Sequence, residues 1–439
     1  MNSLIPALFQ SRQSKVPQTI WRLALPMILA NISVPLLGFV DTAVIGHLPK
    51  ATFLAGTALG SLLITVLFWL CGFLRMSTTG LVAQASGRDD GVGITRVLGQ
   101  GMVFAWALGV VIILCQSFIF STLPILTGAS SELDEALEFA RQYFDIRIWI
   151  APVTLSSMVL TGLLIGLGQT KRVLFAIIVC NLINLVADLL FVPVMGLNVR
   201  GLAFASVLAE LIQIVILLRF VVQLVNIKTL RHLPMTTGLG QLFRLNGTLF
   251  LRSALLQLCL SFMTIYASHY GEQAVAINAI LMQFFLFISF SMDGIAYALE
   301  SQVGKSFGAN QLWKARLFIH YGLVMALKLS LAYSLIYGLL YQPIVSALTS
   351  IPTLRSELAS YWWCVLLMPL ISFTSFIYDG IFIGLSWVKA MRNSMAIASL
   401  GFFILVYSSL AWGNQGLWVA FLGFLLLRGG SQHWMLRRL

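Results

Sequence analysis

The chain has 439 residues, of which 59% are hydrophobic and only 10% are charged, and its mean hydropathy is +0.93. Soluble domains carry roughly 25% charged residues, so this composition excludes a soluble protein and indicates an integral membrane protein. The formal net charge of +12 does not indicate a nucleic-acid partner, because the basic residues are spread over short connectors and form no single patch.

Apolar segments long enough to cross a bilayer follow one another along the whole chain. A transmembrane helix needs about 20 apolar residues, and no removable signal peptide is expected before the first segment. The polar turns 168–172 and 412–416 separate neighbouring apolar segments. The sequence therefore predicts an all-α integral membrane protein with spans at 18–45, 54–82, 96–121, 137–166, 171–195, 199–224, 245–268, 278–303, 315–341, 358–385, 390–411 and 414–437.

The distribution of Lys and Arg predicts the orientation of these spans. If the N-terminus is cytoplasmic, most basic residues, including Arg428 near the C-terminus, lie on the cytoplasmic side, as the positive-inside rule requires. The basic residues then left outside are Lys50, Arg141, Arg147, Arg200 and Arg355. We expect a multi-pass protein of the bacterial inner membrane with both termini in the cytoplasm.

The longest connector is basic, covers residues 219–244 and divides the chain into two sets of six spans. We expect an N-terminal lobe at 1–218 and a C-terminal lobe at 245–439. An ordered series of residues recurs at a nearly constant offset between the lobes, and it includes the pairs Gly101 and Gly322, Pro152 and Pro369, Gly162 and Gly380, and Gly166 and Gly384. Two six-span repeats that enter the membrane in the same direction are related by a pseudo-two-fold axis along the membrane normal.

The first span carries a carboxylate and two prolines. A charge in the hydrocarbon region costs at least ~2.5–3.5 kcal/mol, so Asp41 is a functional-site candidate. Pro26 and Pro35 remove intrahelical hydrogen bonds and make the helix bendable. We interpret Asp41 as a titratable group and Pro26 as a hinge. The alternative for Pro26 is a static kink.

The fifth span carries a second carboxylate and an amide. Asn184 and Asp188 are four residues apart and therefore share one helix face, and both lie in the same lobe and outer half as Asp41. Desolvation and like-charge repulsion both favour the protonated form of a carboxyl group. These residues are predicted to exchange a proton as one unit. The alternative is a static hydrogen-bonded brace between the two spans.

The second lobe contains further intramembrane acids. Asp293 and Glu300 lie on one face of the eighth span, and Asp379 lies in the tenth. They are candidates for a second site, but structural pairing with Arg252 or Lys328 is an equal alternative. All five cysteines fall in apolar segments, where they behave as small hydrophobic residues, so we predict no disulfide, no metal site and no cofactor.

Several of these segments together resemble a known family. The segments Ala24-Leu-Pro26, Gly38-Phe-Val-Asp41-Thr-Ala-Val-Ile-Gly-His47, Arg75-Met-Ser-Thr-Thr-Gly80, Asp293-Gly-Ile-Ala-Tyr297 and Met391-Arg-Asn-Ser-Met395, with Asn184 and Asp188, are similar to the MATE (multidrug and toxic compound extrusion) family, and within it to the DinF branch. The resemblance covers nearly the whole chain.

This resemblance implies an antiporter that exports small organic cations by alternating access of two lobes. It also implies that Asp41, Asn184 and Asp188 form the first-lobe site and that the first span bends at Pro26 on protonation. The NorM-like branch places an acid in the seventh span for sodium, whereas span 245–268 has only Gln257 there. We therefore expect coupling to protons in a monomer, with a sodium-coupled exporter or a lipid-linked precursor flippase as alternatives. A membrane-embedded enzyme is disfavoured, because no zinc-binding or nucleophile motif is found.

Overall fold

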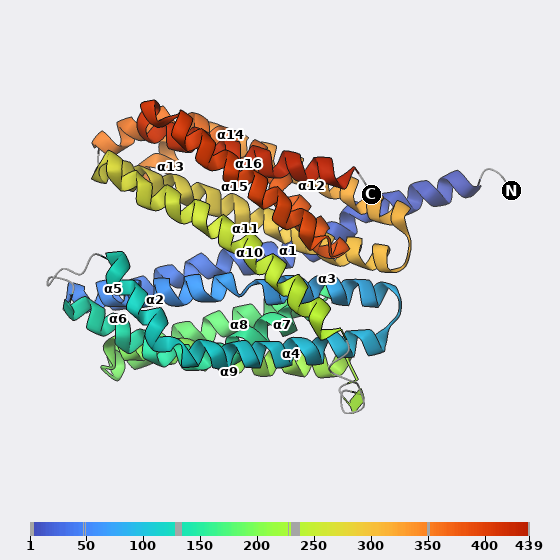
Figure 1. The fold of residues 1–439 in the computed structure, drawn as a ribbon, viewed down its shortest axis with the longest axis horizontal. Helices are drawn as coiled ribbons and strands as arrows, with labels where there is room; N and C mark the ends of the chain where they lie inside the picture. The colour runs from blue at the N-terminus through green and yellow to red at the C-terminus, as the bar shows by residue number, and fades with distance from the viewer. Residues whose placement is uncertain are drawn as a thin grey trace. The chain divides into compact units, whose positions relative to one another are not determined.

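The structure is a computed structural model that describes residues 4–46, 48, 50–127, 134–226, 228–229, 238–348 and 352–437, and in these ranges every regular element is helical (Figure 1). Twelve helices or helix pairs are long and apolar enough to cross a membrane. This count confirms the predicted number of spans. The predicted divisions at the polar turns 168–172 and 412–416 are confirmed as well. Helix α7 (Ala151–Gly166) ends before α8 (Thr170–Leu189), and α15 (Val388–Ser408) ends before α16 (Gly413–Leu436).

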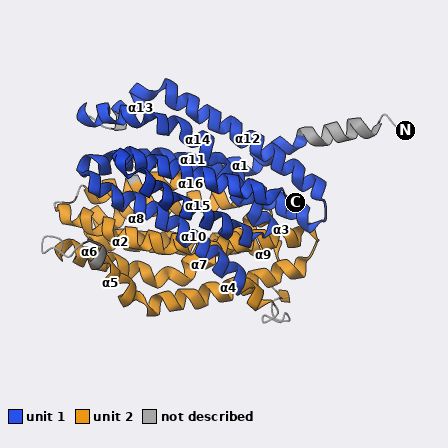
Figure 2. Cartoon of the chain, turned by 45° about the horizontal axis from the view of Figure 1, so that its top comes forward, with its two compact units in different colours: residues 1–28, 243–439 blue, residues 29–242 orange. Residues whose placement is uncertain are grey.

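The chain forms two compact units (Figure 2): unit 1 comprises residues 1–28 and 243–439, and unit 2 comprises residues 29–242. The division at Leu242 falls inside the predicted linker, of which residues 227 and 230–237 lie outside the described part of the chain, as does His47. Helix α1 (Leu4–Gly46) contributes to both units. The first 28 residues thus pack with the second half of the sequence, whereas the sequence analysis assigned them to the first lobe.

Unit 2 contains five further spans, and two of these consist of more than one helix. The second span is broken at Cys71-Gly72, and the fourth passes through a short 3-10 turn at Ile148–Ile150. After α8 the helix widens into a π turn at Leu190–Val194 that contains Pro193, a residue without a backbone donor. The remaining helices of unit 2 are α2 (Ala51–Leu70), α3 (Phe73–Gly87), α4 (Gly91–Leu114), α5 (Gln116–Thr127), α6 (Asp134–Arg147) and α9 (Asn198–Leu224).

Unit 1 repeats the packing of unit 2. Its helices are α10 (Leu239–Ala267), α11 (Glu272–Gly308), α12 (Leu312–Leu339), α13 (Tyr341–Leu348), α14 (Pro352–Leu385), α15 and α16. In unit 2 the fourth span (α6 and α7) packs against the second, third and sixth spans, and α8 packs against α9. In unit 1 the tenth span (α14) packs against α11, α12 and α16, and α15 packs against α16. The equivalent spans therefore make equivalent contacts within each unit.

The repeated glycines explain how closely these helices approach. A Cβ atom at Gly162 of α7 would lie 2.5 Å from the Arg75 carbonyl oxygen of α3, and one at Gly380 of α14 would lie 2.5 Å from the Ala296 carbonyl oxygen of α11. One turn later, a Cβ at Gly166 would lie 2.8 Å from the Thr79 carbonyl oxygen. Small residues allow helix backbones to approach in this way inside a membrane, so these matched glycines fix the same helix pair in each unit.

Candidate functional site

The two first-lobe carboxyl groups lie together in unit 2. Asp188 of α8 is fully buried, and Asn184 one turn earlier is 2% exposed on the same face of the helix. The Asp41 carboxyl group of α1 lies within hydrogen-bonding range of the Asp188 carboxyl group. The structure thus brings Asp41 and Asp188 together and places Asn184 next to them along α8.

The polar atoms of this site lack protein partners. Oδ1 of Asp41, both carboxyl oxygens of Asp188 and Nδ2 of Asn184 are buried and accept or donate no hydrogen bond among the described residues. Two ionised carboxylates have no proton to donate to each other, and their burial in apolar surroundings costs free energy unless a partner is present. The arrangement is therefore suited to a shared proton or to a bound cation.

A hydrogen bond two turns earlier sets the register of α1 and α8. Nδ2 of Asn181 donates to Oγ of Ser33 over 2.9 Å, and Ser33 donates to the Ala30 carbonyl oxygen. Asp41 follows Ser33 by eight residues and Asp188 follows Asn181 by seven, which is about two turns on each helix. The sequence analysis did not single out Ser33 or Asn181. The spacing of Asn181, Asn184 and Asp188 along one helix face is the signal that would have indicated Asn181.

A buried ion pair lies within electrostatic range of Asp41. Nη2 of Arg147, the last residue of α6, contacts Oε1 of Glu210 in α9 over 2.6 Å. The other oxygen of Glu210 accepts a hydrogen bond from Oγ1 of Thr154 in α7. Arg147 is 7% exposed, so its side chain lies inside the helix bundle of unit 2. It is buried there because Glu210, 63 residues away, supplies an opposite charge that a count of basic residues does not take into account.

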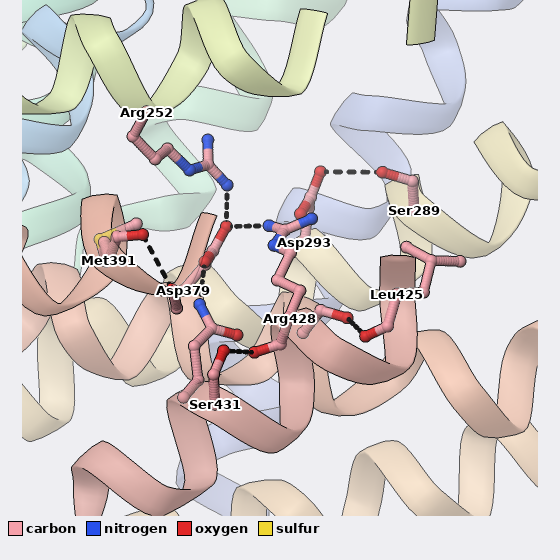
Figure 3. A network of polar contacts seen from close by, with 11 residues as sticks. Arg252, Ser289, Asp293, Asp379, Met391, Leu425, Arg428 and Ser431 are labelled. Atoms are coloured by element: carbon pink, nitrogen blue, oxygen red, sulfur yellow. Dashed lines mark hydrogen bonds and ion pairs between the residues drawn. The ribbon is translucent and has the colours of Figure 1, made fainter. Parts of the chain in front are cut away.

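The acids of unit 1 form a separate network (Figure 3). Asp379 of α14 accepts hydrogen bonds from Arg252 of α10 and from Arg428 of α16, and Nε2 of Gln432 donates to it over 2.6 Å. Arg252 is 3% exposed and Arg428 is 1% exposed. The structure therefore gives Asp379 the structural pairing with Arg252 that was one of the two alternatives. It also places Arg428 inside the helix bundle of unit 1, a burial that the count of basic residues did not predict.

The other two second-lobe candidates lie on α11. Asp293 accepts a long hydrogen bond of 3.5 Å from Ser289 and acts electrostatically on Arg252, so it belongs to the network around Asp379. Glu300 is buried seven residues further along α11, about 10 Å away along the helix axis. The carboxylates of Asp379 and Asp293 thus balance the charges of the two guanidinium groups, those of Arg252 and Arg428.

Pro26 lies in α1 next to the boundary between the two units, which falls after Ile28. In unit 1 this part of α1 packs closely on α11. A Cβ atom at Gly294 would lie 2.3 Å from Cγ1 and 2.9 Å from the backbone nitrogen of Ile28. Proline removes one hydrogen bond from a helix interior, so α1 is weakened close to the point where its residues change from one compact unit to the other.

No group of three His, Cys, Asp or Glu side chains converges in a metal-binding arrangement among the residues that the structure describes. The five cysteines are free. The fold and the site together define a twelve-span helical membrane protein with a buried pair of acids in one unit and a charge-balanced network in the other.

Comparisons with known proteins agree with this class. The MatE family model matches residues 26–190 and 249–407. The chain is 36% identical to DNA damage-inducible protein F of Escherichia coli over 434 residues, covering 95% of this chain and 92% of that protein. It is 24% identical to a probable multidrug resistance protein NorM of Halalkalibacterium halodurans, covering 74% of this chain and 72% of that protein.

Solved structures share the fold. A MATE protein in its bent conformation superposes with a TM-score of 0.88 at 21% identity and covers 97% of this chain and 96% of its own. The Vibrio cholerae MATE transporter VcmN superposes with a TM-score of 0.87 at 18% identity and covers 98% of this chain and 99% of its own. The chain belongs to the MATE family of membrane transporters.

Proposed function

We propose that this MATE-family protein is a proton-coupled antiporter that exports small organic cations from the cell. The observation that carries the proposal is the buried pair formed by Asp41 and Asp188, in which Oδ1 of Asp41 and both carboxyl oxygens of Asp188 have no hydrogen-bond donor among the described protein groups. Relatives named as probable multidrug resistance proteins support an export function. The similarity to the Escherichia coli protein supports a location in the inner membrane, where we place both termini in the cytoplasm.

The proposed mechanism uses the two carboxyl groups as one binding site for alternative ligands. In the deprotonated state, the site carries negative charge in an apolar environment and binds an organic cation, with Asn184 as a neutral donor or acceptor beside it. A proton that reaches the pair from outside removes one negative charge from it, weakens its attraction for the cation and so promotes release. Antiport requires that the proton and the substrate oppose each other's binding, and this coupling is reciprocal.

The contacts of unit 1 support protons over sodium as the coupling ion. A sodium ion needs several oxygen ligands that are free to coordinate it. Asp379 already accepts hydrogen bonds from Arg252, Arg428 and Gln432, and α10 contributes an arginine and no acid to this network. The internal guanidinium groups thus occupy the coordination positions of the carboxylate.

The position of Pro26 in α1 supports the proposed hinge role. The residues before Pro26 pack in unit 1 on α11, and Asp41 lies in the part of α1 that belongs to unit 2. A change of charge at Asp41 alters the interaction of α1 with α8, and bending at Pro26 lets the two parts of α1 respond separately. The proton would therefore change both the affinity of the site and the conformation of the helix that carries it.

Transport in proteoliposomes with separately imposed gradients tests the proposed function. Purified protein is reconstituted, a fluorescent organic cation is supplied, and either a pH step or a sodium step is applied. We expect the cation to be transported when the pH step is applied and not to be transported when the sodium step is applied. A response to the sodium step alone would contradict proton coupling, and no movement of cation under either gradient would contradict the export function.

A further inference from the structure

The ion pair between Arg147 and Glu210 is not explained by packing alone. Both side chains lie inside the helix bundle of unit 2, with side-chain exposures of 8% and 18%. A buried ion pair is often no more stabilising than well-packed apolar residues of the same size, because both charges lose their hydration. Its presence beside a pair of titratable carboxyl groups therefore points to an electrostatic role.

The positive member of the ion pair lies within electrostatic range of the Asp41 carboxyl group. Among the described residues, the groups that act on the Asp41 carboxyl are Asp188 of α8 and Arg147 of α6. The Tyr143 hydroxyl of α6 is within electrostatic range of both Asp41 and Arg147. Glu210 contacts Nη2 of the guanidinium group and also acts on Tyr143, and Cys180 of α8 is a further titratable group within range of Arg147 and Glu210.

Glu210 engages only part of the guanidinium group. Arg147 uses Nη2 to contact Glu210, while its Nε and Nη1 atoms are buried and have no hydrogen-bond partner in the part of the chain that the structure describes. Glu210 itself is held by Thr154 through its second oxygen. The carboxylate is thus fixed in place and offsets a positive charge that would otherwise act in full on Asp41, the partner of Asp188.

We infer that Arg147 and Glu210 are positioning residues that set the proton affinity of the Asp41–Asp188 pair in opposite directions. Arg147 supplies positive potential that allows a buried carboxyl group to ionise. Glu210 limits that potential, so that the pair still takes up a proton and still accepts a cationic substrate. This inference deepens the proposed function and rests on Asp41 and Asp188 being the titrating groups.

The inference predicts opposite effects for the two members of the pair. Replacing Glu210 with Gln keeps the hydrogen-bonding shape but leaves Arg147 unneutralised, so protonation of the carboxyl pair needs a lower pH. Replacing Arg147 with Met removes the positive charge, so the pair stays protonated to a higher pH. Each shift is expected to be about one pH unit, which is the effect of one nearby charge at an effective dielectric constant of about 20.

Infrared titration of the purified full-length protein measures these shifts without transport. The C=O absorption of protonated carboxyl groups is followed with pH, and the band of the pair is identified by its loss in Asp41→Asn. We expect the midpoint to fall in Glu210→Gln and to rise in Arg147→Met. Because Arg147→Met leaves Glu210 without its partner, the double variant Arg147→Met/Glu210→Met is measured as well, and its midpoint should lie between those of the wild type and Arg147→Met.

The matched control is Glu135→Gln. Glu135 forms an ion pair with Lys50 over 2.7 Å in the same unit, but both side chains are solvent-accessible, so its removal should leave the midpoint unchanged. Midpoints that stay within a few tenths of a pH unit, or that move in the same direction in both single variants, would overturn the inference. If the midpoints move as expected but the wild-type protein transports no cation under a pH step, the proposed function fails and the electrostatic role stands.

Discussion

Asn181 of α8 donates a 2.9 Å hydrogen bond to Ser33 of α1, and this bond lies about two helical turns before the point where Asp41 and Asp188 of the same two helices meet. The similar spacing, eight residues on α1 and seven on α8, means that the two helices run in the same direction and keep nearly the same register over this stretch. The hydrogen bond therefore positions one carboxyl group against the other, although neither Ser33 nor Asn181 carries a charge.

Substituting Asn181 by Leu should uncouple the two carboxyl groups. A net hydrogen bond contributes about 1 kcal/mol, so we expect a small loss of stability but a large fall in pH-driven export, because the spacing of Asp41 and Asp188 is no longer fixed. The variant is compared with Ser61→Ala, which removes a hydroxyl that donates within its own helix α2. Equal export by Asn181→Leu and wild-type protein would contradict the role of the register.

Substituting Asp379 by Asn should destabilise unit 1. The change leaves Arg252 and Arg428 buried without a full counter-charge, and breaking a buried pair in this way costs ~3–5 kcal/mol. Thermal unfolding in detergent measures the loss. The control is Asp145→Asn, since Asp145 pairs with Arg141 at an exposed position over 3.6 Å and should contribute no more than ~0.5 kcal/mol. Similar melting temperatures for the two variants would show that the network is not structural.

Substituting Gly294 by Ala should disturb α1 beside Pro26. The added methyl group would overlap Ile28, both its side chain and its backbone nitrogen, and overpacking of this kind typically costs ~1–3 kcal/mol. We expect a lower melting temperature and slower export, because the part of α1 before the hinge is displaced from α11. Gly430→Ala in α16 is the control, since no heavy atom lies within 4 Å of its added methyl group and alanine favours a helix. A matching loss in both variants would argue against a specific contact.

Hydropathy was sufficient to predict the twelve spans, because each helix must present apolar residues to lipid over about the same length. The repeat was visible in the sequence through its glycines, since Gly162 and Gly380 each permit a close helix contact for which a side chain leaves no room. The shared face of Asn184 and Asp188 followed from their spacing alone. These features are local or periodic, and a single sequence contains them.

The partners of the buried arginines could not be predicted in the same way. Arg147 and Arg428 lie within predicted spans, and a count of basic residues assigns them only to a side of the membrane. Their partners Glu210 and Asp379 are 63 and 49 residues away, and only the packing of distant helices brings the charges together. The contribution of the first 28 residues to unit 1 was missed for the same reason, because it depends on contacts between α1 and the second half of the chain.

The most direct test of the proton-coupled site is the number of protons released when a substrate binds. Purified protein in a weakly buffered solution is mixed with a saturating organic cation, and the pH change is recorded for the wild type and for Asp41→Asn. If Asp41 and Asp188 bind a proton and a cation in opposition, the wild type should release up to about one proton per bound cation, and Asp41→Asn should release none. Cation binding by the wild-type protein without proton release, across the pH range of transport, would contradict this account.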